Sequence, residues 1–181
     1  ALGNSLVAGY GLEKADTFTS QLKRAFRTDG LEILLINGGV SGDTSAGGRA
    51  RLDWALSDKP DAVIVELGAN DGLRGLEPSE TERNLDAIIA KVTSRGIPVL
   101  LSGMRAPPNL GVEYASEFNA IYPRIAKRYG VLFDPFFLSG VAAVPTLNQA
   151  DGIHPNKEGV AVIIKRLMPM LRDLADQSQK N

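Results

Sequence analysis

Short runs of apolar, mostly β-branched residues alternate along this chain with longer stretches in which apolar positions recur at helical spacing. The short runs predict four strands, at residues 31–36, 62–67, 97–101 and 131–133. Their centres lie roughly 33 residues apart, which leaves room for a strand, a helix and two loops. A further strand is expected to end just before the Gly3-Asn4-Ser5 turn.

The longer stretches predict amphipathic helices at residues 17–27, 44–56, 79–92, 113–129 and 155–175. Ser79 and Glu82 have the spacing of a capping box, and Pro169 should kink or end the regular part of the last helix. This alternation is typical of an α/β protein whose parallel sheet is covered by helices on both faces. Because no linker-like segment interrupts it, residues 1–181 are expected to form one domain.

In sheets of this kind, ligands bind outside the carboxyl ends of the strands. The loops expected at that edge hold an unusual share of the Gly, Asn, Ser and Asp of the chain, and they are residues 4–11, 37–43, 68–78, 102–113 and 147–155. Functional residues are therefore expected in these loops.

The composition narrows the chemistry that these loops can support. The 181 residues include no cysteine and one histidine, and the 20 Lys and Arg and 21 Asp and Glu give a net charge of −1. The lack of cysteine excludes disulfides, a thiolate nucleophile, cysteine-ligated zinc and iron–sulfur clusters, and a single histidine excludes metal sites that need two. Balanced charge argues against nucleic-acid binding. No apolar run approaches the ~20 residues of a transmembrane helix.

His154 is the only imidazole that could act as a base, and it lies in the sequence Asp151-Gly152-Ile153-His154-Pro155. A carboxylate three residues before an imidazole can reach it across one turn, accept a hydrogen bond from one ring nitrogen and leave the other as a base. The same residues are also compatible with an ordinary Asp-Gly turn before a helix that begins at proline.

Three further loops contain candidates for acyl-transfer chemistry. Ser5 is a candidate nucleophile, although a serine at a turn is more often a helix cap, and Val7 stands where the G-x-S-x-G elbow needs glycine. Gly42 could present a backbone N–H to an anion, and Asn70 its side-chain amide, although glycine and asparagine are also common in turns. Taken together, the four loops contain a nucleophile, a base with its carboxylate, and oxyanion donors.

The same motifs resemble those of the SGNH (GDSL) hydrolase superfamily, in particular its bacterial thioesterase I, lysophospholipase L1 and arylesterase branch. The similarity covers nearly the whole chain. The matching segments are GNSL at residues 3–6, NGGVSGDTSAG at 37–47, ELGANDGLRG at 66–75 and DGIHPN at 151–156. The resemblance implies a flavodoxin-like three-layer α/β/α sandwich with a five-stranded parallel sheet of order 2-1-3-4-5.

The resemblance also implies roles for individual residues. It implies Ser5 as nucleophile, His154 as base and Asp151 as the partner of His154. The oxyanion hole would consist of the backbone N–H groups of Ser5 and Gly42 and the amide of Asn70, and neither a metal nor an organic cofactor is expected. The expected partner is a small-molecule ester.

The chain departs from the family pattern at two places. The family motif is Gly-Asp-Ser, whereas Asn4 stands here where aspartate is expected, so we expect an active enzyme with an altered hydrogen-bond network beside Ser5. The family also has a full strand before this motif, of which only Ala1 and Leu2 are present. We therefore expect the native chain to extend at least several residues upstream of Ala1.

Two loops without candidate catalytic groups could form the wall of the substrate pocket. Their apolar residues suit an acyl chain or an aryl group better than a bare sugar, and they are Leu73, Leu76, Met104, Pro107 and Leu110. The alternatives are a carbohydrate acetylesterase of the same superfamily, a non-catalytic module that binds an acyl group, and a nucleotide binder, which the lack of a phosphate-binding loop disfavours. No signal peptide is visible, so the sequence does not decide between a periplasmic and a cytoplasmic location. It also leaves open a homo-oligomer.

Overall fold

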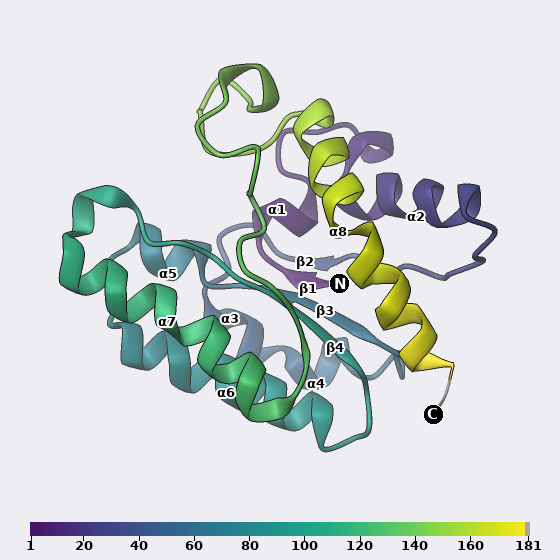
Figure 1. Ribbon diagram of the computed structural model, residues 1–181, viewed down its shortest axis with the longest axis horizontal. Coiled ribbons are helices and arrows are strands. Elements are labelled where there is room, and N and C mark those ends of the chain that lie inside the picture. The colour runs from purple at the N-terminus through teal and green to yellow at the C-terminus, as the bar shows by residue number, and fades with distance from the viewer. Residues whose placement is uncertain (180–181) are drawn as a thin grey trace.

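The computed structural model describes residues 1–179, which contain a five-stranded parallel sheet (Figure 1). The strands are β1 (Leu2–Gly3), β2 (Gly38–Gly39), β3 (Val63–Glu66), β4 (Val99–Ser102) and β5 (Leu132–Asp134). Their order across the sheet is β2-β1-β3-β4-β5, and every neighbouring pair is parallel. The predicted α/β class and strand order are therefore confirmed.

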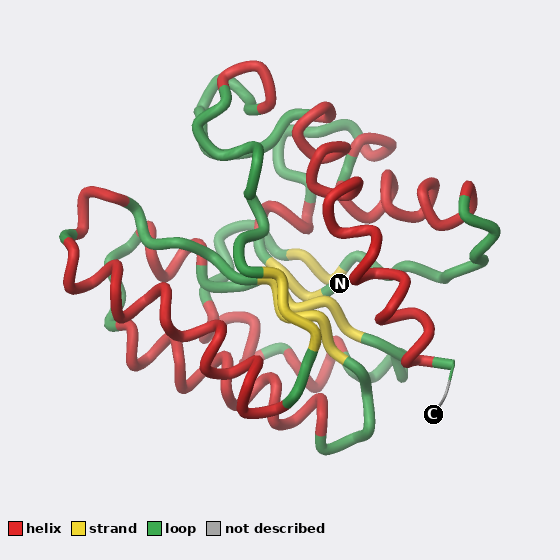
Figure 2. Tube along the Cα trace, viewed as in Figure 1, coloured by secondary structure: helices red, strands yellow, loops and turns green. Residues whose placement is uncertain are grey.

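Helices cover both faces of this sheet, as Figures 1 and 2 show. On one face α2 packs against α8, and α8 also contacts β4 and β5; on the other, α6 packs against α3 and α7, and both α6 and α7 contact β4. The helices are α1 (Ser5–Ala8), α2 (Phe18–Thr28), α3 (Ser45–Ala50), α4 (Leu52–Ala55), α5 (Ala69–Leu73), α6 (Pro78–Thr93), α7 (Val112–Tyr129) and α8 (Lys157–Ser178). Short 3₁₀ turns lie at Lys14–Asp16, Pro108–Leu110 and Pro145–Leu147.

The core forms where the helix stripes meet the two buried strands in the middle of the sheet. All four residues of β3 and all four of β4 are buried, as expected of strands covered on both faces. The predicted apolar stripe of α6 is completely buried, at Leu85, Ile88, Ile89 and Val92. Burial of this kind supplies most of the stability of such a fold and holds the carboxyl ends of the strands in place.

The structure corrects the predicted strand at residues 31–36. This segment is a loop, and the second strand is the pair Gly38–Gly39. The reason is its neighbour: β1 consists only of Leu2–Gly3, and on this side of the sheet it pairs with Gly38 and Gly39. Residues 31–36 therefore have no strand to complete a ladder, and Leu34 is 82% exposed.

Several helix limits also differ from the prediction. Helix α6 starts at Pro78 after Glu77, so Ser79 is not a cap, and the side chain of Glu82 pairs with Arg124 instead. The helix predicted at residues 44–56 is divided into α3 and α4 at Arg51. Helix α8 starts after its cap Asn156 and runs through Pro169 without ending there.

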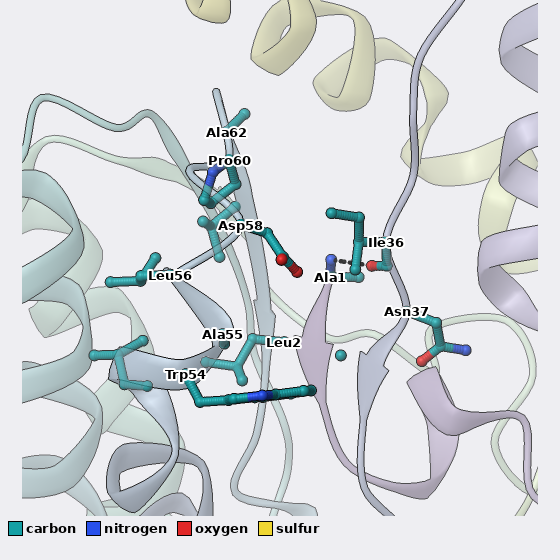
Figure 3. A pocket seen from close by; sticks show the side chains of 13 residues that line it. Ala1, Leu2, Ile36, Asn37, Trp54, Ala55, Leu56, Asp58, Pro60 and Ala62 are labelled. Atoms are coloured by element: carbon teal, nitrogen blue, oxygen red, sulfur yellow. Dashed lines mark hydrogen bonds between the residues drawn. The ribbon is translucent and has the colours of Figure 1, made fainter.

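A pocket opens beside the start of β1, at the amino ends of the strands (Figure 3). Ile36, Trp54 and Pro60 are among its lining residues, and the amino group of Ala1 donates to the Ile36 carbonyl at 2.8 Å. Ser5 follows the carboxyl end of β1, so this pocket lies at the opposite edge of the sheet from the candidate site. Among the described residues, no helix is long and apolar enough to cross a membrane.

Candidate active site

Ser5 is positioned by the end of β1 and the start of α1. Gly3 ends the strand, and a side chain there would lie 2.4 Å from the Val7 side chain, so the close approach of α1 requires glycine. Asn4 then caps α1, because its Oδ1 accepts a hydrogen bond from the Leu6 N–H at 3.0 Å. Ser5 is therefore the first helical residue at the carboxyl edge of the sheet, where it is half-buried.

A continuous row of polar atoms joins Ser5, His154 and Asp151. The Ser5 hydroxyl lies 2.9 Å from His154 Nε2, and His154 Nδ1 lies 2.6 Å from Asp151 Oδ2. Asp151 Oδ1 accepts from the backbone N–H groups of His154 at 3.0 Å and Ile153 at 2.9 Å. These two bonds are the main reason why the pKa of Asp151 falls to about 2. An ionised Asp151 can accept a hydrogen bond from Nδ1–H of His154, which leaves Nε2 free to accept a hydrogen bond from the Ser5 hydroxyl.

Two side chains connect the segment at residues 4–11, which contains Ser5, to the segment at residues 147–155, which contains His154. Gln149 Nε2 donates to the carbonyls of Tyr10 at 2.8 Å and Pro155 at 3.0 Å. The ring of Tyr10 packs on the imidazole of His154, with the ring centroids 4.7 Å apart. Neither Gln149 nor Tyr10 has a role predicted from the sequence, although Tyr10 lies close to Ser5 and Gln149 close to Asp151 along the chain.

Gly42 and Asn70 lie together at the same edge through the loop after β2. Asn70 Nδ2 donates to the Asp43 carbonyl at 2.7 Å, which uses one of its two amide N–H groups. The Gly42 carbonyl accepts from Arg74 at 3.0 Å. Within residues 1–179, no group accepts a hydrogen bond from the N–H of Ser5 or of Gly42. These N–H groups, together with the second N–H of Asn70, remain available to an oxygen atom of a ligand.

Buried side chains that the sequence did not single out hold these loops. Asp71 is fully buried beside Asn70 and accepts from the Ser45 N–H at 2.8 Å and from the Thr81 hydroxyl at 3.2 Å. It thereby fixes α5 to the starts of α3 and α6. Arg51 spans the neighbouring loop and the sheet, since it donates to Asp43 at 2.6 Å and to the carbonyl of Gly3 at 2.9 Å.

Asn4 has an equally buried partner in Glu66, at the end of β3. Neither residue has any exposed surface, and Asn4 Nδ2 donates to Glu66 Oε1 at 3.0 Å. No role of Glu66 is predicted from the sequence. The signal was present, because Glu66 is the one charged residue in the apolar run at residues 62–67, and a charge in a buried strand needs a partner.

Four of the five candidate substrate-binding residues reach the surface, and the fifth is buried. Leu73 and Leu76 are exposed, Pro107 and Leu110 are half-buried, and the Tyr114 hydroxyl joins their two loops by donating to the Leu76 carbonyl at 2.7 Å. Met104 is only 3% exposed and belongs to the core. It therefore presents no surface to a ligand in this structure.

Comparison with known proteins places this chain in a family. A model of the GDSL-like lipase/acylhydrolase family matches residues 1–162. The chain is 38% identical to Esterase TesA of Pseudomonas aeruginosa over 174 residues, which are 96% of this chain and 87% of that protein. It is 39% identical to thioesterase 1/protease 1/lysophospholipase L1 of Escherichia coli over 175 residues, which are 94% of this chain and 83% of that protein.

A solved structure agrees with these relatives. AlinE4, described as an SGNH-hydrolase family esterase, superposes with a TM-score of 0.81 at 46% identity, and the match covers 95% of this chain and 93% of that one. The order and spacing of the motifs, the topology of the sheet and the sequence matches all agree. The chain therefore belongs to the GDSL-like lipase/acylhydrolase family and is an SGNH-type hydrolase.

Proposed function

We propose that this chain is a serine esterase in which Ser5 is the nucleophile, His154 the general base and Asp151 the group that orients His154. The observation that supports this proposal most strongly is the row of contacts of 2.9 Å from Ser5 to His154 and 2.6 Å from His154 to Asp151. Ser5 and His154 lie 149 residues apart in sequence, so the fold is needed to bring the two side chains together.

In the first step His154 Nε2 takes the hydroxyl proton of Ser5 while Oγ attacks the acyl carbonyl carbon. The carbonyl π electrons move to its oxygen and form a tetrahedral oxyanion. As this collapses, the bond to the leaving alcohol or thiol breaks, and the leaving group takes the proton from His154. The product of this half-reaction is an acyl-enzyme on Ser5.

The proposed oxyanion hole consists of the N–H groups of Ser5 and Gly42 and the amide of Asn70. It is supported by the lack of an acceptor for either backbone N–H among residues 1–179 and by the unused amide N–H of Asn70. Donors of this kind stabilise the transition state more than the substrate, because full negative charge develops on the oxygen only in the transition state.

Water completes the cycle. His154 takes a proton from a water molecule, whose oxygen attacks the acyl carbon, and the tetrahedral intermediate forms in the same oxyanion hole. Its collapse breaks the bond to Ser5 Oγ, which recovers its proton from His154, and the carboxylic acid leaves. Every proton transfer in this cycle uses side chains of the chain itself.

The proposed substrates are esters or thioesters with an apolar acyl or aryl group. Leu73 at the end of α5 and Leu76 are exposed, and the side chain of Leu110 lies close to Gly75, which lies between them in sequence. Such side chains favour contact with apolar groups because the contact removes apolar surface from water. Relatives that are named esterase and thioesterase fit the same class.

The test is hydrolysis of p-nitrophenyl esters from acetate to decanoate, with acetylated xylan as the competing substrate and Ser5→Ala as the control. We expect kcat/KM to rise with chain length beyond acetate, and Ser5→Ala to lose this hydrolysis. A preference for acetylated xylan would contradict the apolar class and favour a carbohydrate acetylesterase. No ester hydrolysis at all would favour the non-catalytic binding module.

A further inference from the structure

The carboxyl group of Glu66 lies against Asn4, the residue that precedes Ser5. Glu66 ends β3, and its neighbour in the register of the sheet is Gly3, the residue before Asn4. The Glu66 carboxyl is completely buried and accepts from Asn4 Nδ2 at 3.0 Å and from the Asn4 backbone N–H at 3.4 Å. Within residues 1–179, Asn4 supplies every hydrogen bond of this carboxyl group.

The side chain of Asn4 connects this buried carboxyl group to α1. Its Nδ2 faces Glu66, and its Oδ1 faces the helix, where it accepts from the Leu6 N–H at 3.0 Å and lies 3.5 Å from the Ser5 hydroxyl. The amide therefore has one orientation that satisfies both neighbours. With the amide flipped, Nδ2 would face the N–H of Leu6 and Oδ1 would face the oxygen of Glu66.

We propose that Glu66 is a positioning residue of this esterase, which holds the Asn4 amide in the orientation that caps α1 and so fixes the N–H and hydroxyl of Ser5. The inference rests on the proposed function, because it assigns Ser5 both as nucleophile and as oxyanion donor. Glu66 acts through Asn4 and touches no reacting atom. It explains why a chain with Asn4 in place of the family's aspartate keeps a complete hydrogen-bond network.

The logic of the pair is that one partner must donate where the other accepts. In this chain Asn4 donates twice and Glu66 accepts twice. An aspartate at position 4 would place two carboxyl groups face to face, and the contact could form only if they shared a proton. Asparagine removes the need for a shared proton, and once the pH is above the raised pKa of Glu66 its carboxylate accepts both bonds.

The ionisable groups near Glu66 are few. Burial raises the pKa of Glu66 to about 8, while the hydrogen bonds from Asn4 act in the opposite direction. Tyr122 of α7 lies close enough to interact electrostatically with Glu66, and its hydroxyl donates to the Leu67 carbonyl. Asp71 of α5 is held by donors from α3 and α6. Kinetics are therefore best compared at pH 9, where the Glu66 carboxyl is ionised.

The variant Glu66→Gln keeps the shape of the side chain but replaces one acceptor by a donor. If the oxygen of the introduced glutamine faces Asn4 Nδ2, its NH₂ group faces the Asn4 backbone N–H. In the reverse orientation the NH₂ group faces Asn4 Nδ2. Either way one donor faces another, and flipping Asn4 transfers the conflict to the Leu6 N–H. Unsatisfied buried donors of this kind are costly. We expect kcat to fall ~10- to 100-fold with KM little changed.

The double variant Asn4→Asp/Glu66→Gln exchanges the two roles. The introduced glutamine donates to one oxygen of the introduced aspartate and accepts from the backbone N–H of residue 4, while the other aspartate oxygen still caps α1. Every hydrogen bond has a donor and an acceptor again, with no shared proton. We expect the double variant to recover at least ~10-fold of the kcat lost in Glu66→Gln, which is a coupling that separate structural defects do not show.

The assay measures kcat and KM for p-nitrophenyl butyrate at pH 9 for the wild type, Glu66→Gln and the double variant. Asp134→Asn is the matched control, because it also replaces a fully buried carboxylate by an amide, but in the Arg166 ion pair at the end of β5. We expect this control to lower the unfolding midpoint and leave kcat within about two-fold. Folded Glu66→Gln with wild-type kcat, or a double variant no better than Glu66→Gln, would overturn the inference.

A second comparison does not depend on the folding of Glu66→Gln. In Asn4→Asp the introduced aspartate and Glu66 need a shared proton, so kcat should fall as the pH rises and this proton is lost. The double variant has no pair of carboxyl groups, so its kcat should not show this fall. If kcat of Asn4→Asp and of the double variant depends on pH in the same way between pH 7 and 10, the inference is overturned. An inactive wild type would overturn the proposed function and this inference together, whereas an active wild type with flat variant data overturns the inference alone.

Discussion

Asp151 uses its two oxygens for different purposes, and this division determines what its removal should do. One oxygen meets His154 Nδ1 at 2.6 Å, and the other accepts the backbone N–H groups of its own loop. In Asp151→Asn the loop can keep its backbone bonds, but the new amide group would then face Nδ1. The imidazole must turn Nδ1 into an acceptor, which places the proton on Nε2, where Ser5 must donate.

We therefore expect Asp151→Asn to reduce kcat by ~10²- to 10⁴-fold with little change in KM. The measurement is steady-state hydrolysis of p-nitrophenyl butyrate. Asp53→Asn is the control, because Asp53 is an exposed aspartate that pairs with Lys91 far from Ser5 in sequence. Equal rates for Asp151→Asn and the control would exclude Asp151 from the mechanism.

Asn70 also does two things at the residue scale. It anchors the Asp43 carbonyl at 2.7 Å and retains one amide N–H for an oxyanion. Loss of one oxyanion donor typically reduces turnover by ~10²- to 10³-fold, so Asn70→Ala should lose kcat on that order while its circular dichroism spectrum stays that of the wild type. A rate within two-fold of wild type in a folded protein would remove Asn70 from the oxyanion hole.

At the scale of elements, the turn from β3 into α5 depends on Gly68. Its φ of 105° is one that side chains rarely adopt, and a Cβ there would lie 2.1 Å from the Tyr122 hydroxyl. That hydroxyl donates to the Leu67 carbonyl at 2.9 Å, so it cannot move away from an added Cβ without losing this hydrogen bond. The position of Asn70 at the start of α5 follows from this tight turn.

Gly68→Ala should therefore destabilise the protein by more than its backbone strain alone, which costs ~1–3 kcal/mol. Gly30→Ala is the matched control, since Gly30 also has a positive φ, of 78°, but a methyl group added there would have nothing within 4 Å. Urea unfolding of both variants measures the difference. Equal losses of unfolding free energy would show that the contact with Tyr122 has no effect.

The same scale explains which elements the sequence could predict. The stripe of α6 and the strands β3 to β5 follow from apolar patterns that are local, so they were predicted within a few residues. Residues 31–36 have an equally strong apolar pattern but no neighbouring strand, and a ladder needs two strands. Ser79 has the spacing of a cap, but Pro78 already begins the helix one residue earlier.

The candidate site divides in the same way. Ser5, Gly42, Asn70 and the Asp151–His154 turn could be predicted as candidates because each belongs to a short motif with its own chemistry. Glu66 was not found, because its contact with Asn4 spans 62 residues and exists only in the register that sets Gly3 beside Glu66. A local sequence pattern does not specify which residues two strands bring together.

At the scale of the whole molecule, the buried Glu66 links stability to pH. Its pKa of about 8 in the folded protein lies above the ordinary value of 4.5. Between these two pH values the unfolded chain has released the proton that the folded chain keeps. The stability that this group contributes is therefore fully present below pH 4.5 and is lost as the pH rises through 8.

We expect the unfolding free energy of the wild type to decline from pH 5 to pH 8 relative to that of Glu66→Gln, which has no group to titrate at this position. Urea unfolding at several pH values measures it. Asp151 does not interfere, because its lowered pKa gives stability that is present above pH 3.8 and is lost only as the pH falls toward 2. Parallel curves for wild type and Glu66→Gln would contradict the assignment of a raised pKa to Glu66.

The central claim, that Ser5 is the nucleophile of an esterase, is tested most directly by covalent labelling with a fluorophosphonate followed by peptide mass spectrometry. Attack by Ser5 Oγ on phosphorus expels fluoride and leaves a stable phosphonyl ester, as acylation expels the leaving alcohol. We predict one adduct per chain, located on Ser5, with ester hydrolysis lost in proportion to labelling and no adduct in Ser5→Ala. Hydrolysis that persists in fully labelled protein, or an adduct on another serine in place of Ser5, would contradict the claim.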